Sequence, residues 1–163
     1  MRIYVPATSS MLARLAEVQV VAASPVTAFA VTPGLRSWYV AGDEEELEFA
    51  ALSAAARASL RLIDEDLSAD RRRVVVVAEV SDADVTVHDD LDRGVVRLTE
   101  PVRLLDVVAF HVDLDDAREA IAAASAAILR ADLGDDAAQE IVDDAEGFDL
   151  AWYATQELPD LLR

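Results

Sequence analysis

Apolar residues spaced three and four apart over residues 43–67 predict the longest helix of the chain. Asp43 is placed to cap its first turn, and Glu46, three residues later, completes a variant of the capping box. One apolar stripe comprises Phe49, Leu52, Ala56, Leu60, Ile63 and Leu67, and a second comprises Leu47, Ala51, Ala54, Ala58 and Leu62. Because the two stripes together exceed the arc of an ordinary surface helix, we expect this helix to pack on two neighbours or to lie deep against a sheet.

Short runs rich in valine and other β-prone residues predict strands through the first two thirds of the chain. The most strand-like run, residues 74–80, is expected to lie in the centre of the sheet. Pro6 is expected to end the first strand, and Pro101 to interrupt the ladder further on. The predicted strands comprise residues 2–5, 26–32, 74–80, 85–87, 95–98, 102–104 and 107–112.

Further helical segments are predicted before and after these strands. Thr8 or Ser9 is placed to cap a short helix, and residues 35–41 are expected to form one more helical turn. Beyond residue 112 we expect only helices, which end at glycine or before proline. They comprise residues 113–134, 135–147 and 148–158.

The order of these elements predicts the α+β class. Helices and strands mix at first, strands cluster in the middle and helices close the chain, without the regular alternation of a parallel sheet. The length of 163 residues and the lack of a linker rich in Gly, Ser or Pro indicate one domain over residues 1–163. We expect a mostly antiparallel or mixed central sheet of about four to six strands, packed against the long helix and a C-terminal helical segment.

Composition removes several classes of enzyme. The chain has no Lys, no Asn and no Cys, and its only two histidines are His88 and His111. Without Cys it has no thiolate nucleophile and no disulfide, and without Lys it has neither a Schiff base nor a Walker lysine. The sequence also contains no G-x-S-x-G elbow and no G-x-G-x-x-G loop. No cofactor is therefore predicted, apart from the divalent metal considered below.

Acidic residues dominate the charge, which is formally −18. The excess is concentrated in residues 82–163, which hold 21 acids and 6 Arg, whereas residues 1–81 hold 11 acids and 8 Arg. This charge argues against nucleic acid as a partner, because phosphate binding needs a basic surface. It suits a basic protein partner or metal ions, and it equally suits a solvated helical surface.

The apolar runs are too short or too interrupted to cross a bilayer, and residues 1–6 carry no leader-like core. We therefore expect a cytoplasmic protein without a membrane partner. The sequence leaves open whether the chain forms a homo-oligomer.

His111 and Asp113 stand two residues apart at the end of a predicted strand, which places both side chains on one face. A carboxylate beside an imidazole holds one tautomer and raises its basicity, as a general base or a metal ligand requires. These two residues are the candidate catalytic pair. The alternative is that Asp113 caps a helix and that His111 is a half-buried strand residue.

Asp43, Glu44 and Glu46 place several carboxylates in one helical turn, and hard divalent cations prefer oxygen ligands of this kind. Together with His111 and Asp113 they are the candidate ligands of a divalent metal. Acids at a helix start also complement the helix dipole without any ion, so both interpretations stay open.

Both tryptophans are followed by tyrosine, as Trp38 with Tyr39 and as Trp152 with Tyr153. Each pair lies in or beside a predicted helical stretch. Two amphipathic rings at one place can form a partner-binding hot spot, but large rings dominate packing wherever they occur, so core anchoring is the favoured interpretation.

Five segments spread over nearly the whole chain carry a resemblance to a known family. They are MRIYVP at 1–6, FAVTP at 29–33, WY at 38–39 with GDEEELE at 42–48, HVD at 111–113 and WYATQE at 152–157. On these segments the chain resembles a family of uncharacterised actinobacterial proteins that is classed as a domain of unknown function. The resemblance implies an actinobacterial, cytosolic, single-domain protein, in agreement with a GC-rich codon composition. Because the family has no assigned activity, the resemblance implies no catalytic residue.

The sequence therefore favours a non-catalytic interaction or regulatory protein, whose acidic C-terminal half or Trp–Tyr pairs meet a protein partner. One alternative is a divalent-metal-dependent hydrolase that uses His111, Asp113 and the acids near Asp43. A second alternative is a small-ligand-binding domain with its pocket between the central sheet and the terminal helices.

Overall fold

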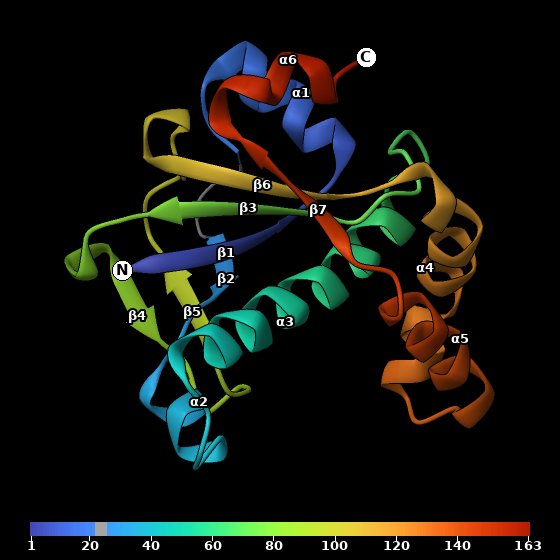
Figure 1. Cartoon of the computed structure of the whole chain (residues 1–163), viewed down its shortest axis with the longest axis horizontal. Coiled ribbons are helices and arrows are strands. Elements are labelled where there is room, and N and C mark those ends of the chain that lie inside the picture. The colour runs from blue at the N-terminus through green and yellow to red at the C-terminus, as the bar shows by residue number, and fades with distance from the viewer. Residues whose placement is uncertain (22–25) are drawn as a thin grey trace.

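The computed structural model describes residues 1–21 and 26–163, and Figure 1 shows their arrangement. Every strand pairing in these residues is antiparallel, and the sheet is open, with the strand order β4-β5-β2-β1-β3-β6-β7. Its strands are β1 (Arg2–Ala7), β2 (Val26–Phe29), β3 (Val74–Glu79), β4 (Val85–Val87), β5 (Val95–Leu98), β6 (Val107–Asp113) and β7 (Leu150–Ala154). The α+β prediction is confirmed, whereas the described residues form seven strands rather than four to six.

The described residues also form six α-helices. They are α1 (Ser9–Val18), α2 (Pro33–Trp38), α3 (Glu44–Glu65), α4 (Arg118–Asp132), α5 (Asp136–Glu146) and α6 (Leu158–Leu161). Figure 1 shows α3 running diagonally across one face of the sheet from α2 toward α4, with α1 and α6 close together elsewhere. None of the helices in residues 1–21 and 26–163 is both long enough and apolar enough to cross a membrane.

The alternation of side chains in the central strands separates two cores. Ile3 and Val5 of β1 point to one face, where they pack in a cluster with Leu12 and Leu15 of α1 and with residues of α6. The intervening Tyr4 points to the other face, in a cluster under α3. A third cluster joins the C-terminal half of α3 to α4 and α5. The long helix therefore packs on two neighbours, the sheet and the α4–α5 pair, as its double stripe predicts.

Local signals set both the start and the position of α3. The Asp43 carboxylate accepts the Glu46 N–H at 2.9 Å and so caps the helix. In the C-terminal half of α3, the buried Ser59 hydroxyl donates to Ala7 C=O at 2.7 Å and accepts from Val74 N–H at 3.1 Å. These two bonds tie the helix to the end of β1 and the start of β3.

The predicted stripe of α3 is wrong at two positions. Phe49 is exposed on the open side of the helix, and Leu67 is exposed beyond its last turn. The buried row instead follows Leu47, Ala51 and Ala55. The small alanines lie closest to the sheet, and Phe49 lies at the edge of the buried arc, on the side of β6 and β7.

The largest error concerns residues 148–158, which do not form a helix. Residues 150–154 are strand β7, paired with β6 in the register His111 to Trp152, and the short helix α6 follows a turn. One edge of β6 has backbone N–H and C=O groups available for pairing, and Trp152 and Tyr153 favour extended structure. This tertiary pairing outweighs an apolar pattern that is too short to distinguish a strand from a helix.

Three smaller predictions are also corrected. Residues 102–104 do not form a sheet strand but lead into a tight turn, Leu104–Asp106. Pro6 lies inside β1 and does not end it. β2 ends at Phe29 because Thr32 turns the chain by accepting the Leu35 N–H at 3.2 Å, so α2 begins at Pro33.

Asp89 holds that turn against the β4–β5 hairpin. Its carboxylate accepts the Thr32 hydroxyl at 2.6 Å and the N–H groups of Gly34 and Gly94, each at 2.9 Å. A Cβ at Gly34 would lie 2.4 Å from the Asp89 Cγ, so any larger residue there would displace the Asp89 carboxylate.

Candidate functional site

A groove lies between α3 and β7 on the face of the sheet that α3 only partly covers. It consists of two adjoining pockets of about 720 Å³ and about 480 Å³, which share Phe49, Leu52 and His111. We call it the α3–β7 groove. Its walls and floor are formed by Phe49 and Leu52 of α3, Leu150 and Trp152 of β7, and Ala109 and His111 of β6.

Strand alternation explains why these side chains meet. His111 and Trp152 are directly paired across β6 and β7, so both side chains point to the α3 face of the sheet. Phe49 faces them from α3, and the Phe49 and Trp152 side chains are each 61% exposed. The groove therefore presents two largely uncovered aromatic rings around a half-buried imidazole.

Asp113 shares this face of β6 with His111, as predicted, but its carboxylate is taken by another partner. Arg73 donates to it from Nε at 2.8 Å, from Nη2 at 2.8 Å and from its backbone N–H at 2.7 Å. The Arg73 Nη2 also donates to Phe148 C=O at 2.7 Å. Through Arg73, Asp113 is therefore linked to the segment that precedes β7. Its carboxylate neither orients His111 nor caps a helix.

His111 itself is half-buried, and this burial lowers the pKa of its imidazole below the ordinary value. The neutral ring is therefore favoured in the folded protein. A neutral imidazole in an apolar groove offers one hydrogen-bond donor and one acceptor to a bound group.

This shift predicts how stability depends on pH. The unfolded chain binds a proton at His111 more readily than the folded one, so stability contributed by the neutral ring is lost as pH falls below about 6.5. We expect urea titrations of the wild type to show a decline between pH 7 and pH 5 that is shallower in His111→Gln. Identical pH slopes for the two proteins would contradict the assignment.

The predicted metal ligands are not brought together. Asp43 caps α3 and Glu44 forms an ion pair with Arg36, both at the end of α3 beside α2 in Figure 1. His111 and Asp113 lie instead on β6, and Glu46 lies in the first turn of α3. In residues 1–21 and 26–163 no group of three or more His, Asp or Glu side chains is placed to hold a metal ion.

The two Trp–Tyr pairs have different surroundings. Trp38 is 60% exposed and stacks under the Arg93 guanidinium, which lies 3.5 Å from the ring centroid. Trp152 lies in the groove, whereas Tyr153 points to the opposite face and packs on the core there. Core anchoring is therefore wrong for both tryptophans, and of the two only Trp152 lines a described pocket.

The charges around the groove leave a negative remainder. Arg2 pairs with Glu79 at 2.8 Å, and Arg57 pairs with Glu146 at 3.3 Å. Two further acids of the lining, Glu48 and Asp149, have no ion pair in the part of the chain that the structure describes. Burial, with the Glu48 charge in support, raises the pKa of Tyr4 at one end of the groove to about 12.

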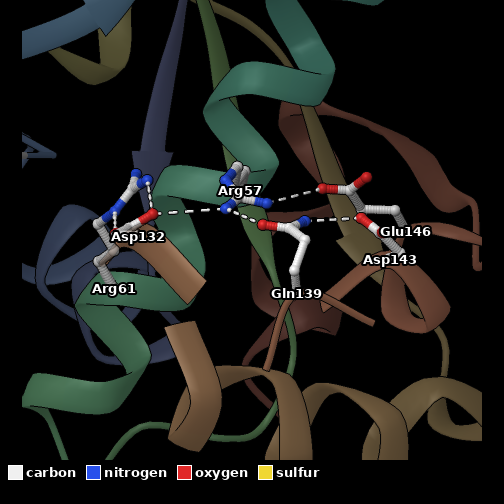
Figure 2. Close-up of polar contacts among 6 residues, drawn as sticks. All are labelled: Arg57, Arg61, Asp132, Gln139, Asp143 and Glu146. Atoms are coloured by element: carbon white, nitrogen blue, oxygen red, sulfur yellow. Dashed lines mark hydrogen bonds and ion pairs between the residues drawn. The ribbon is translucent and has the colours of Figure 1, made fainter. Parts of the chain in front are cut away.

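A polar network fixes the wall at the other end, where α3 meets α4 and α5 (Figure 2). Arg61 donates to both oxygens of Asp132 at 2.7 and 2.9 Å, and Arg57 donates to Asp132 at 3.4 Å. Arg57 also donates to Gln139 at 3.2 Å. Arg57 is therefore held by groups from α4 and α5, and its positive charge is already paired with carboxylates.

Sequence reasoning found Trp152 and His111 but missed Phe49, Leu52 and Leu150 as neighbours in one groove. The alternation of Phe148, Leu150 and Trp152 is a strand signal that points to one face. Nothing in the sequence pairs that segment with β6, so its juxtaposition with α3 depends on the tertiary structure.

Residues 1–162 match a family described as "Family of unknown function (DUF6912)". No curated protein and no solved structure matches the chain significantly.

Proposed function

The chain belongs to the DUF6912 family, whose function is unknown, and we propose that it is a protein-interaction module that binds a cationic segment of a partner protein in the α3–β7 groove. The observation that carries this proposal is the pair of aromatic side chains, Phe49 and Trp152, each 61% exposed, that face one hollow. Exposed aromatic anchors beside a pocket are typical of binding hot spots.

The arrangement of apolar side chains supports an interface here. Other exposed large apolar residues, such as Leu67, Leu105 and Leu133, line none of the described pockets. In the groove, by contrast, Phe49 and Trp152 adjoin the half-buried Leu52 and Leu150. Contiguous exposed apolar surface of this kind marks interaction sites more often than scattered single residues do.

Charge identifies the chemistry of the partner. The chain carries a net charge of −18, and the groove retains Glu48 and Asp149 after its arginines are paired. A segment with Arg or Lys beside its apolar residues would complement both features, and salt would slow its association. A second copy of the chain would bring the same negative charge and is disfavoured.

Binding is favoured over hydrolysis by the state of the polar groups. The Asp113 carboxylate is saturated by Arg73, so His111 has no carboxylate on its own strand to orient it. Imidazoles that bind metals are almost always oriented by a carboxylate, a backbone carbonyl or a water, and the carboxylate on the His111 strand is already occupied.

The test is a selection of random 12-residue peptides on the immobilised full chain, followed by affinity measurements on synthetic copies. We expect the recovered peptides to be cationic and to bind Phe49→Ala and Trp152→Ala each about 30-fold more weakly, which corresponds to about 2 kcal/mol. Leu133→Ala, which removes an exposed apolar side chain outside the groove, serves as the matched control and should bind as the wild type does.

Two results would contradict the proposal. One is the recovery of no binding peptide. The other is recovery of peptides whose affinity is the same for wild type, Phe49→Ala and Trp152→Ala, because their binding site would then lie elsewhere.

A further inference from the structure

We infer that the partner segment binds in extended form as an additional strand on the free edge of β7, with alternate side chains in the α3–β7 groove. This inference rests on the proposed function and adds the binding mode and the conformation of the partner.

Two hydrogen bonds show which backbone groups of β7 point outward. Asp113 N–H donates to Arg73 C=O at 3.1 Å, so the backbone groups of Asp113 and His111 face β3 and not β7. On β7, Ala154 N–H donates to the Glu157 carboxylate at 2.7 Å, away from β6. By the alternation of an antiparallel ladder, the N–H and C=O groups of Leu150 and Trp152 also point away from β6.

These outward groups lie on an edge that no strand of the described residues covers, since β7 ends the sheet. The strand itself, Leu-Ala-Trp-Tyr-Ala, contains no charged residue and no proline. Natural edge strands are usually protected by charges, proline, bulges or short length. β7 has five residues and none of the first three protections, so it suits pairing with another chain.

The opposite edge of the sheet provides a comparison within the same molecule. β4 has three residues and directly follows the acidic turn Asp82–Asp84. Acids lie beside both edge strands, so the edges differ in length: β4 is too short to offer more than one or two outward residues, whereas β7 offers Leu150, Trp152 and Ala154. The contrast between the two edges indicates that the open edge of β7 is a specific feature of this end of the sheet.

The groove and the edge serve the same bound segment. Leu150 and Trp152 point their side chains into the groove and their backbone groups outward, so a strand added to β7 lies directly beside the groove. Every second side chain of that strand then falls on the groove side, next to Trp152. Backbone pairing supplies affinity, and these alternate side chains supply specificity.

Acidic groups at both ends of β7 set the charge of the segment. Asp149 directly precedes the strand, and Glu157 follows it and caps Ala154. In a pairing of two β7 strands, antiparallel alignment would bring Asp149 of one copy near Glu157 of the other. A cationic segment of a different protein meets the same groups with favourable charge.

The test uses the cationic peptides recovered in the selection on the full chain. Each peptide is synthesised in two further forms, with N-methyl groups on its odd or on its even amides. Because only one of the two sets faces β7 in a strand pairing, we expect one form to bind about 10-fold more weakly or worse and the other to bind within about 2-fold of the parent.

A pair of protein variants checks the same contact from the other side. Leu150→Ala and Leu150→Pro both lose the leucine side chain, but only proline also lacks the outward N–H, and proline is tolerated at the first residue of an edge strand. We expect Leu150→Pro to bind the peptide about 2–10-fold more weakly than Leu150→Ala. If Leu150→Pro does not fold by its melting curve, amide exchange at Leu150 and Trp152 replaces it, and both amides should exchange more slowly in the complex.

The outcomes separate the two proposals. Peptides that lose affinity in Phe49→Ala and Trp152→Ala, yet bind equally well with either N-methyl pattern, would overturn strand addition and leave the groove as the binding site. Failure to recover any peptide would overturn the proposed function itself. A dimer of the chain that Leu150→Pro dissociates would replace the cationic partner with a second copy.

Discussion

Replacing Asp113 with alanine is expected to destabilise the protein by about 3–5 kcal/mol, because it leaves a buried Arg73 guanidinium without its counter-charge. The side chains of Arg73 and Asp113 are 4% and 0% exposed, and their Nη2–Oδ1 distance is 2.8 Å. The lost carboxylate also accepts the Arg73 backbone N–H. Urea unfolding followed by circular dichroism measures the change as a lower midpoint at an unchanged slope.

Two comparisons make this expectation specific. Asp115→Ala removes an exposed carboxylate two residues away, and it should change stability by no more than about 0.5 kcal/mol. The double variant Arg73→Met with Asp113→Leu removes both charges, so it should recover much of the loss seen in Asp113→Ala. A cost below about 1 kcal/mol for Asp113→Ala would show that the ion pair is not the buried contact described above.

Replacing Phe110 with alanine is the second large expected effect, at about 3–5 kcal/mol of lost stability. The Phe110 ring is fully buried in the core between the sheet and the helices α1 and α6. Its removal loses transfer free energy and leaves a cavity that strands held by ladders on both sides cannot close. Because Phe110 pairs with Tyr153 of β7, amide exchange in β7 should also accelerate.

Phe49→Ala is the matched control, since it is the same substitution at a ring that is 61% exposed. We expect it to change the free energy of unfolding by less than about 0.5 kcal/mol while it weakens peptide binding. The two phenylalanines thus separate stability from binding. Equal destabilisation by both variants would place Phe49 in the core and contradict the open groove.

Local sequence signals predicted α3 because they act within one helical turn or within one repeat. The Asp43 cap and the row of small and apolar residues depend on neighbours three and four positions apart. The same signals wrongly predicted that Phe49 is buried. The apolar stripe is wider than the buried arc of the helix, so the pattern does not show which edge of the stripe faces the sheet.

The end of the chain shows the limit of this reasoning. Residues 148–158 carry apolar residues at spacings that fit a strand and a helix equally, and both need only a few residues. The choice falls to β6, whose outer edge offers backbone partners to residues 150–154. The candidate pair His111 and Asp113 shows the same limit. Strand alternation predicted that the two side chains share a face, but the Asp113 carboxylate binds Arg73, which lies forty residues earlier in the chain.

The sequence by itself determined the α+β class, the long capped helix, the valine-rich strands and the strong negative charge, because each of these follows from composition or from neighbours along the chain. Only the tertiary structure decided that β7 is an edge strand, that Asp113 is locked by Arg73, and that Phe49 and Trp152 face one groove. The physical reason is that a strand pairing and a buried ion pair each join residues far apart in the chain, so their partners exist only once the fold has formed.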